Sequence, residues 1–233
     1  MQGATYAGVM TTPLPSTPVP PAAPTGTRDR LLDAAADLFY REGVGVGVEA
    51  LCRAAGVSKR SMYQLFASKD EVVAASLDRV APRYRTALIP SEEDHRSPRE
   101  RILHVFERLE ALSASPDFRG CPFVATAIEL KSPRHPGSLV ARRHKDALTS
   151  FFRQEAEHGG ATDPTLLAQQ LTIVYDGASS RAVVQADALH GVAVTTAAAL
   201  LDLAGLSRRA HSTDDAPQPI PAGQRPGGDR THG

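Results

Sequence analysis

The chain has 233 residues, of which 42% are hydrophobic and 5% aromatic, and its 26 basic residues balance its 26 acidic ones. This composition is that of a globular protein, and the length allows one large domain or two small ones. The sequence contains no run of about 18 uninterrupted apolar residues, so we expect no membrane span. Because the net charge is zero, any contact with nucleic acid requires a local cluster of basic side chains.

The two cysteines, Cys52 and Cys121, stand far apart, without a CxxC pair or a His-x-x-x-His motif. The sequence therefore predicts no disulfide framework, no metal site and no cofactor. Cys52 lies on an apolar helix face and is expected to be buried. Cys121 has Arg119 as its one basic neighbour, which favours a structural role over a redox role. The start of the chain lacks the features of a secretory signal, and we expect a cytoplasmic protein.

Both ends of the chain have the composition of tails. Residues 1–27 contain six prolines and no charged residue, and residues 210–233 are rich in proline and glycine. Such segments have little apolar surface to bury, so we expect both to be disordered. The folded part is then divided into a first domain over residues 28–72 and a helical domain over residues 73–209.

The patterns at the start of the folded part are helical. A first helix ends near Gly43, and a short second helix ends at Gly56. Between them, the alternating glycines of residues 43–47 predict a loop, because glycine weakens a strand and no partner strand exists. The apolar faces of the two helices are formed by Leu31, Leu32, Ala35, Leu38 and Phe39, and by Val48, Leu51, Cys52 and Ala55.

Later helices are marked by their first residues. Ser68 with Glu71 forms an expected capping box, and the helix that follows should reach about Arg83. Ser97 with Pro98 and Glu100 is a second such start. Further helices are expected from Pro122 to before Pro133, from Pro136 to Gly159, and from Pro164 onward.

Residues 48–69, VEALCRAAGVSKRSMYQLFASK, predict two short helices joined by a tight turn, which is a helix-turn-helix. From Arg53 to Lys69 this segment has four basic residues and no acidic one. The second helix should turn Val57, Met62, Leu65 and Phe66 inward, with contact to a thymine methyl group as the alternative for Leu65. Its outward face should carry groups that bind phosphates and base edges in the major groove, namely Lys59, Arg60, Ser61, Tyr63 and Gln64.

This region resembles the DNA-binding domain of tetracycline-repressor (TetR) type regulators. LLDAAADLFYREG at residues 31–43 is similar to the first helix of the family, and AGVS at residues 55–58 is followed at the family's spacing by Tyr63, Phe66, Ser68 and Lys69. The resemblance implies an all-α fold with an N-terminal three-helix DNA-binding domain and a C-terminal helical domain for ligand binding and dimerisation. It also implies DNA contacts by Ser58, Lys59, Arg60, Ser61, Tyr63, Gln64 and Lys69. Two departures are Val46-Gly47, where the family usually has threonine, and Arg60, where a small residue is usual.

The helix from Pro164 onward has two apolar stripes, so one of them needs a partner outside its own core. Together with small residues at 177–180 and 193–198, this pattern predicts a homodimer in which the eighth and ninth helices form a four-helix bundle. By analogy with the family, the middle helices should enclose an apolar pocket for an unknown small molecule. The expected lining residues are Phe106, Leu109, Phe123, Ile128, His144, Phe151, Phe152 and Tyr175.

The sequence thus predicts a ligand-responsive regulator, a homodimeric repressor that leaves a palindromic double-stranded DNA operator when a small molecule moves the helix of residues 69–83. A transcriptional activator is an alternative. Another is a ligand-binding dimer that has lost DNA binding, which the Val46-Gly47 departure keeps open. An enzyme is not expected, because the sequence offers no nucleophile with a base and hence no catalytic residues.

Overall fold

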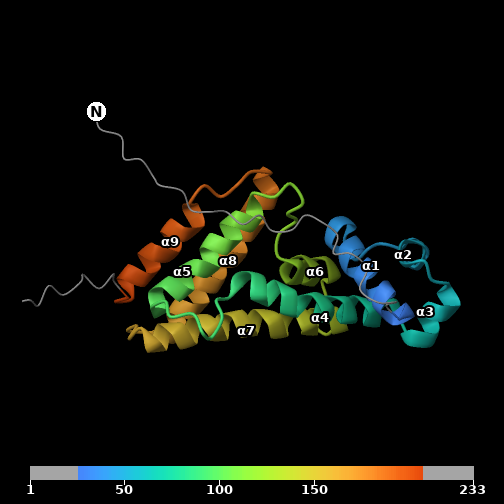
Figure 1. Cartoon of the computed structure of the whole chain (residues 1–233), viewed down its shortest axis with the longest axis horizontal. Coiled ribbons are helices and arrows are strands. Elements are labelled where there is room, and N and C mark those ends of the chain that lie inside the picture. Colours follow the sequence, from blue (N-terminus) through green and yellow to red (C-terminus); the bar gives the residue numbers. More distant parts are fainter. Residues whose placement is uncertain (1–25, 207–233) are drawn as a thin grey trace, which may run out of the picture.

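The computed structural model describes residues 26–206, and all regular elements in that range are helices, so the expected all-α fold is confirmed (Figure 1). The expected tails lie outside the described residues, except for Gly26 and Thr27, and Thr27 opens the first helix. The helices are α1 (Thr27–Glu42), α2 (Val48–Ala55), α3 (Lys59–Leu65), α4 (Lys69–Leu88), α5 (Pro98–Ser113), α6 (Pro122–Leu130), α7 (Pro136–His158), α8 (Pro164–Gln185) and α9 (Val192–Leu203).

A small head at one end of the molecule consists of α1, α2, α3 and the first turns of α4 (Figure 1). Its core is formed by apolar side chains that the helical spacing placed on one face of each helix. Leu31, Leu51 and Met62, from three different helices, are fully buried, and Val72 joins them from α4. The loop between α1 and α2 is confirmed as a loop.

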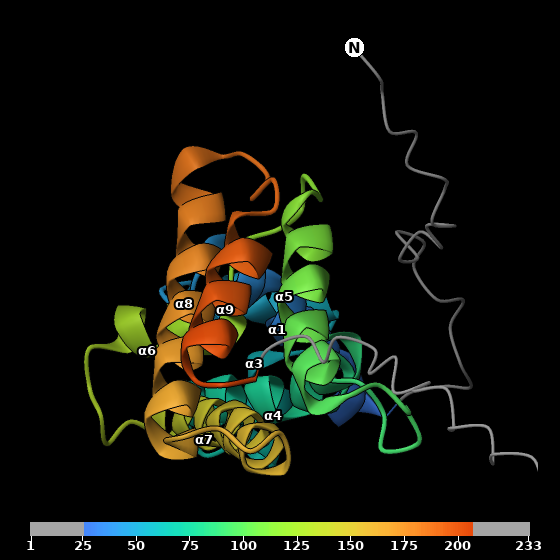
Figure 2. The same ribbon diagram turned by 90° about the vertical axis from the view of Figure 1, so that its left-hand side faces the viewer.

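The larger body holds a second buried cluster that runs from the middle of α4 to α9. α4 leaves the head and lies along α7. α5, α8 and α9 pack together on one side of this helix pair (Figures 1 and 2). Phe106 of α5, Phe152 of α7 and Tyr175 of α8 are the largest side chains of this core. No helix within residues 26–206 is both long enough and apolar enough to cross a membrane.

α4 extends further than its sequence predicts. The expected end near Arg83 is wrong, because the helix continues past Pro82 to Leu88. Pro82 lacks an N–H and cannot bond to the carbonyl four residues earlier, but it lies on the exposed side of the helix, where water can replace that bond. The apolar residues beyond it, among them Leu88, are buried against the body and keep the last turn helical.

The two predicted capping boxes differ in the structure. At α5 the box is complete, since Ser97 Oγ accepts from the N–H of Glu100 and the Glu100 carboxylate accepts from the N–H of Ser97. At α4, Ser68 Oγ accepts from the N–H of Glu71 at 3.3 Å, but Glu71 Oε2 accepts at 2.8 Å from Ala67 rather than from Ser68. The second half of that box is therefore corrected: the glutamate reaches one residue further back along the chain.

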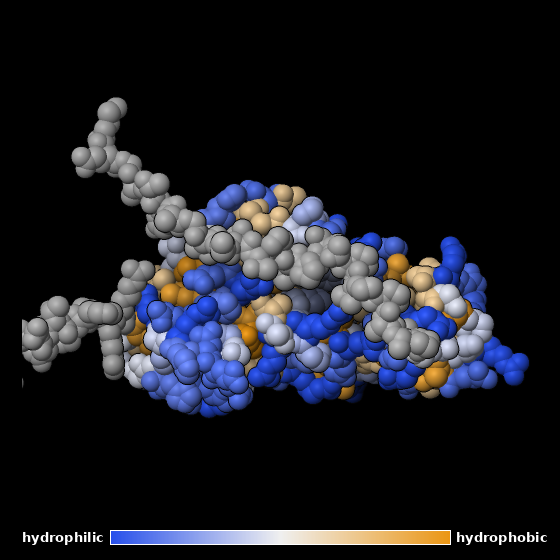
Figure 3. Space-filling model, viewed as in Figure 1, coloured by the Kyte–Doolittle hydropathy of each residue, from blue (hydrophilic) through white to orange (hydrophobic). Residues whose placement is uncertain are grey.

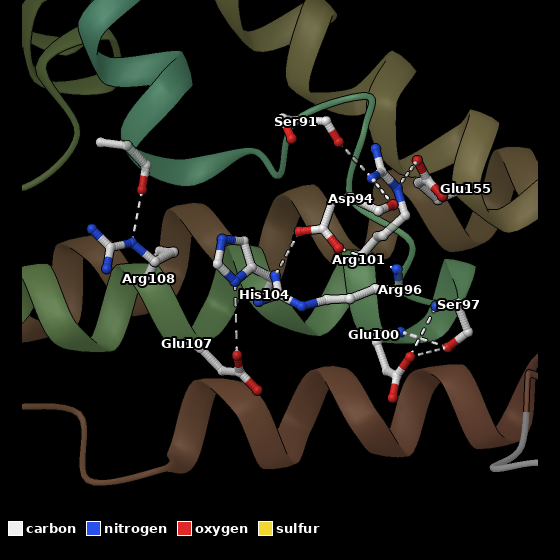
Figure 4. Close-up of polar contacts among 11 residues, drawn as sticks. Ser91, Asp94, Arg96, Ser97, Glu100, Arg101, His104, Glu107, Arg108 and Glu155 are labelled. Atoms are coloured by element: carbon white, nitrogen blue, oxygen red, sulfur yellow. Dashed lines mark hydrogen bonds and ion pairs between the residues drawn. The ribbon is translucent and has the colours of Figure 1, made fainter. Parts of the chain in front are cut away.

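The segment between α4 and α5 is fixed by arginines of α5 (Figure 4). Arg101 donates to Glu155 of α7 at 2.8 Å and to the carbonyl of Ser91 at 2.8 Å. Arg108 donates to the carbonyl of Ala87 at 2.9 Å. The side chains of Arg101 and Glu155 are only 13% and 9% exposed, so this ion pair is shielded and joins α5 to α7.

Candidate nucleic-acid interface and internal cavity

The helix-turn-helix is formed by α2, a short turn and α3. α2 ends at Gly56, whose left-handed backbone (φ +63°) closes the helix at a position that favours glycine. Ser58 then caps α3: its Oγ accepts from the N–H of Ser61 at 3.0 Å and lies 2.9 Å from Ser61 Oγ. Both serines are thus engaged with each other at the N-terminus of α3, the end of a helix that favours a phosphate.

α3 is anchored by Met62, which is fully buried, and by Phe66 just beyond its end. Cys52 of α2 lies behind them, with its Sγ 3.9 Å from Met62 Sδ, as expected for a small buried side chain. Of the two roles expected of Leu65, inward packing is wrong, because the side chain is 40% exposed, and contact with a thymine methyl group stays a prediction. α3 has seven residues, and Met62 and Phe66, four apart, occupy its buried side, so Leu65 lies at the edge.

The outer face of α3 presents Arg60, Tyr63 and Gln64 to solvent. Tyr63 is 54% exposed, and none of the three has a hydrogen bond or ion pair within residues 26–206. A guanidinium, a phenol and an amide on one exposed helix face can reach phosphates and base edges without first breaking an internal contact. The face expected from the sequence is therefore present and accessible.

The two lysines expected at the interface have partners inside the head. Lys59 Nζ lies 2.5 Å from Glu49 Oε1, and this hydrogen bond lowers the pKa of the Glu49 carboxyl and raises that of Lys59. Lys69 Nζ donates to the carbonyl of Val44 at 2.5 Å. Glu49, ten residues before its partner, was not identified from the sequence, since no local spacing connects the start of α2 with the start of α3.

The loop before α2 is held by α6. The Glu129 carboxylate accepts from the N–H of Val44 and from that of Gly45, both at 2.8 Å. Gly43 has φ +85°, and a Cβ there would lie 2.7 Å from Glu129 Oε2, so this close approach requires glycine. Because Lys69 binds the carbonyl of Val44, the loop is tied on one side to α6 and on the other to α4.

The segment just before α6 also contacts the head. The Tyr40 hydroxyl of α1 donates to the carbonyl of Gly120 at 3.2 Å and accepts from the N–H of Arg119 at 2.8 Å. Burial raises the pKa of Tyr40, which keeps the hydroxyl able to donate. These contacts join residues about eighty positions apart in the sequence, and no sequence pattern predicts them.

A cavity of about 350 Å³ lies between α4, the start of α6, α7 and α8. Its accessible surface is mainly apolar, as expected from the sequence, although several charged side chains also border it. The lining residues are Asp78, Ala81, Pro82, Tyr84, Arg85, Leu88, Ile89, Cys121, Phe123, Arg143, His144, Lys145, Ala147, Leu148 and Tyr175.

The residues expected to line a pocket fall into three groups. Phe123, His144 and Tyr175 line the cavity. Ile128 is 67% exposed on α6 and does not line it, because α6 buries the side that carries Phe123. The remaining four are packed in the body core outside the lining: Phe106, Leu109, Phe151 and Phe152.

Cys121 caps α6 and is 4% exposed in the cavity wall, and burial raises the pKa of its thiol. A buried thiol with a raised pKa is a poor nucleophile. Within residues 26–206, no group of three or more His, Cys, Asp or Glu side chains is placed to hold a metal ion.

α8 leaves an apolar stripe uncovered, as its two-sided pattern predicts. Leu166 is 50%, Ile173 71% and Val184 77% exposed, and on α9 Val192 and Leu203 are 54% and 84% exposed. Figure 3 shows apolar side chains at the surface at the end of the molecule that holds α9. An uncovered apolar stripe of this kind is typical of interaction surfaces.

A helical body with a cavity, joined by one long helix to a helix-turn-helix head, defines the class of helix-turn-helix DNA-binding regulators. A sequence model described as "Bacterial regulatory proteins, tetR family" matches residues 31–76. A solved structure described as a tetR transcriptional regulator, from Streptomyces avermitilis MA-4680, is 58% identical, with a TM-score of 0.76, over 78% of this chain and 99% of that one. The chain belongs to the TetR family of transcriptional regulators.

More distant structures share the fold. A TetR transcriptional regulator from Chloroflexus aurantiacus J-10-FL is 25% identical, with a TM-score of 0.66, over 76% of this chain and 94% of that one. A TetR-family regulator from Streptomyces coelicolor is 24% identical, with a TM-score of 0.66, over 77% and 93% of the two chains. A comparison with curated proteins finds no match. As a family member, the chain is a DNA-binding regulator and not an enzyme.

Proposed function

We propose that the chain is a homodimeric repressor that leaves a palindromic operator when a small molecule enters the cavity. The observation that carries this proposal is that α4 belongs to both parts of the molecule. Val72 and Val73 of its first turns are packed in the head core, and from Asp78 to Ile89 the same helix and its C-cap line the cavity. A ligand between α4 and α7 therefore acts on the helix that carries the head.

The head follows α4 because the two are held together by ion pairs. Arg79 donates to Asp33 at 2.5 and 2.9 Å and to Asp29 at 2.8 Å, so α4 is joined to α1. A shift of α4 then turns the whole head, and in a dimer it changes the separation of the two α3 helices. A ligand needs to favour the released arrangement by only a few kcal/mol to shift the population.

The dimer is proposed to form through the uncovered stripe of α8 and the exposed residues of α9. A two-fold pair would place two α3 helices about 34 Å apart, or a multiple of that distance, along one face of DNA. Ile173→Glu puts a charge into this stripe and should convert the dimer to a monomer in sedimentation velocity. Leu139→Glu on α7, at an apolar residue that is 43% exposed away from the stripe, is the matched control. A variant at Ile173 that remains dimeric would refute the interface.

Operator binding is tested by fluorescence anisotropy with a duplex taken from the DNA upstream of the chain's own gene, and with a random duplex, at several salt concentrations. Arg60→Ala should weaken binding to both and lower the salt slope by about one. Gln64→Ala should weaken binding to the upstream duplex alone. Arg142, an exposed residue of α7, provides the control Arg142→Ala. Equal losses on both duplexes for Gln64→Ala would contradict a role in base recognition.

Lys59 and Lys69 are proposed to contact DNA phosphates. Lys59 would give up its present hydrogen-bond partner to do so, and Lys69 would keep its partner. Lys59 would leave the exposed Glu49 carboxylate for a phosphate, while Lys69 can keep the Val44 carbonyl and donate a second hydrogen. Lys69→Ala should then weaken binding to every duplex and also loosen the loop before α2. Glu49→Gln, which frees Lys59, should strengthen binding at low salt, and a weaker complex would argue against this role of Lys59.

A further inference from the structure

The lining of the cavity between α4 and α7 carries more positive than negative charge. Arg85, Arg143 and Lys145 line it, against the single lining carboxylate of Asp78. Arg143 Nη2 donates to both oxygens of Asp78, at 3.0 and 3.2 Å, and Lys145 is paired with Asp176 of α8. Among residues 26–206, Arg85 is therefore the lining cation without an ion-pair partner.

The inner part of the lining is aromatic. The rings of Phe123 and His144 are stacked, with centroids 4.6 Å apart and an interplanar angle of 27°. Tyr84 meets the Phe123 ring edge-on at 5.5 Å, and Tyr175 is fully buried behind them. Flat ring surfaces of this kind pack best against a planar apolar ligand rather than a flexible chain.

Two hydroxyl groups lie among these rings. Tyr84 Oη and Tyr175 Oη are 3.0 Å apart, and burial raises the pKa of both side chains, so both remain protonated at neutral pH. One hydroxyl donates to the other, and Cys121 is a further hydrogen-bond partner of Tyr84, so both hydroxyl hydrogens have acceptors within the cavity wall.

We propose that the cavity binds a planar aromatic carboxylic acid. Its ring packs against Phe123 and His144, and its carboxylate contacts Arg85 at the solvent side of the cavity. The volume suits a molecule of roughly one or two rings. A neutral molecule of the same shape gains nothing from Arg85, and a cation is repelled by it. This inference rests on the proposed function, because it names the chemical class of the releasing ligand.

The test compares acids with their uncharged counterparts. Binding of benzoate, 1-naphthoate and 2-naphthoate to the full chain is measured by calorimetry without DNA, beside benzamide, 1-naphthamide and 2-naphthamide. At least one acid should bind about tenfold more tightly than its amide. Arg85→Ala should remove most of that difference and leave the affinity for the amide unchanged. Arg83→Ala, at an exposed residue of the same helix that does not line the cavity, should change neither.

The outcomes separate this inference from the proposed function. If no acid binds more tightly than its amide, or if Arg83→Ala has the effect of Arg85→Ala, the ligand class is wrong. If an amide displaces the DNA duplex as well as its acid does, release by a ligand is supported and the acid class is refuted. If an acid binds through Arg85 and leaves the DNA complex intact, the acid class is supported and the release mechanism is refuted.

Discussion

Glu129→Ala should loosen the loop that precedes the helix-turn-helix. The carboxylate accepts two backbone hydrogen bonds at 2.8 Å, one at a half-buried site and one at an exposed site. Hydrogen bonds to a charged group contribute about 1.5–3 kcal/mol when shielded, so at this exposure about 1 kcal/mol each is a fair expectation. The variant should then lose about 2 kcal/mol of unfolding free energy, or about 4–8 °C in Tm for a chain of this size.

The assay is urea unfolding followed by circular dichroism, together with DNA binding by anisotropy. Glu129→Gln keeps one acceptor oxygen and should lose about half as much as the alanine variant. Glu93→Ala, at an exposed glutamate between α4 and α5 whose side chain makes no hydrogen bond or ion pair within residues 26–206, is the control. DNA affinity should fall with Glu129→Ala, since the loop positions α2 and hence α3. An unfolding free energy equal to that of Glu93→Ala would refute the reasoning.

Three further expectations follow from the same structure. Gly43→Ala should lower the free energy of unfolding in urea by about 2 kcal/mol, because the left-handed backbone and the Glu129 carboxylate of α6 both oppose a Cβ. Gly47→Ala should be close to neutral, because a Cβ there would have no atom within 4 Å. Arg101→Ala leaves a buried carboxylate of α7 unpaired and should cost about 3 kcal/mol in the same assay. The raised pKa values of Tyr84 and Tyr175 mean that the folded chain holds these protons more tightly than the unfolded chain does. The free energy of unfolding should therefore fall as the pH rises above the ordinary tyrosine pKa of 10.0. Replacing both tyrosines by phenylalanine should make that fall shallower.

Helices and their starts were predictable because their signals are local. The apolar spacing from Leu31 to Phe39, the Ser97 box and the glycine at position 56 each act within one or two turns of chain, and all are confirmed. The errors arose where the outcome depends on neighbours far away in sequence. Proline inside a helix usually ends it, but α4 continues past Pro82 because the turn after it is buried against the body.

The outer face of α3 was predictable for the same local reason, since a seven-residue helix has room for one buried side. The partners of its lysines were not, because Glu49 and the carbonyl of Val44 are brought close only by the fold. Likewise, aromatic spacing does not distinguish a core from a cavity wall. Phe106 and Phe123 look alike in the sequence, and only the packing of α4 on α7 places the second at the cavity.

Among the contacts that hold the head, two sets differ in what a ligand must break. Arg79 joins α4 to α1 by three hydrogen bonds, which move together with α4 and are not strained when it shifts. The bonds from Glu129 and Tyr40 join the head to α6, whose first turns also line the cavity. A ligand that separates α4 from α6 therefore acts against the second set and not against the first. Because Glu129 is exposed and its two bonds are modest, this set offers the lower resistance, and the head should separate from α6 while α1 stays attached to α4.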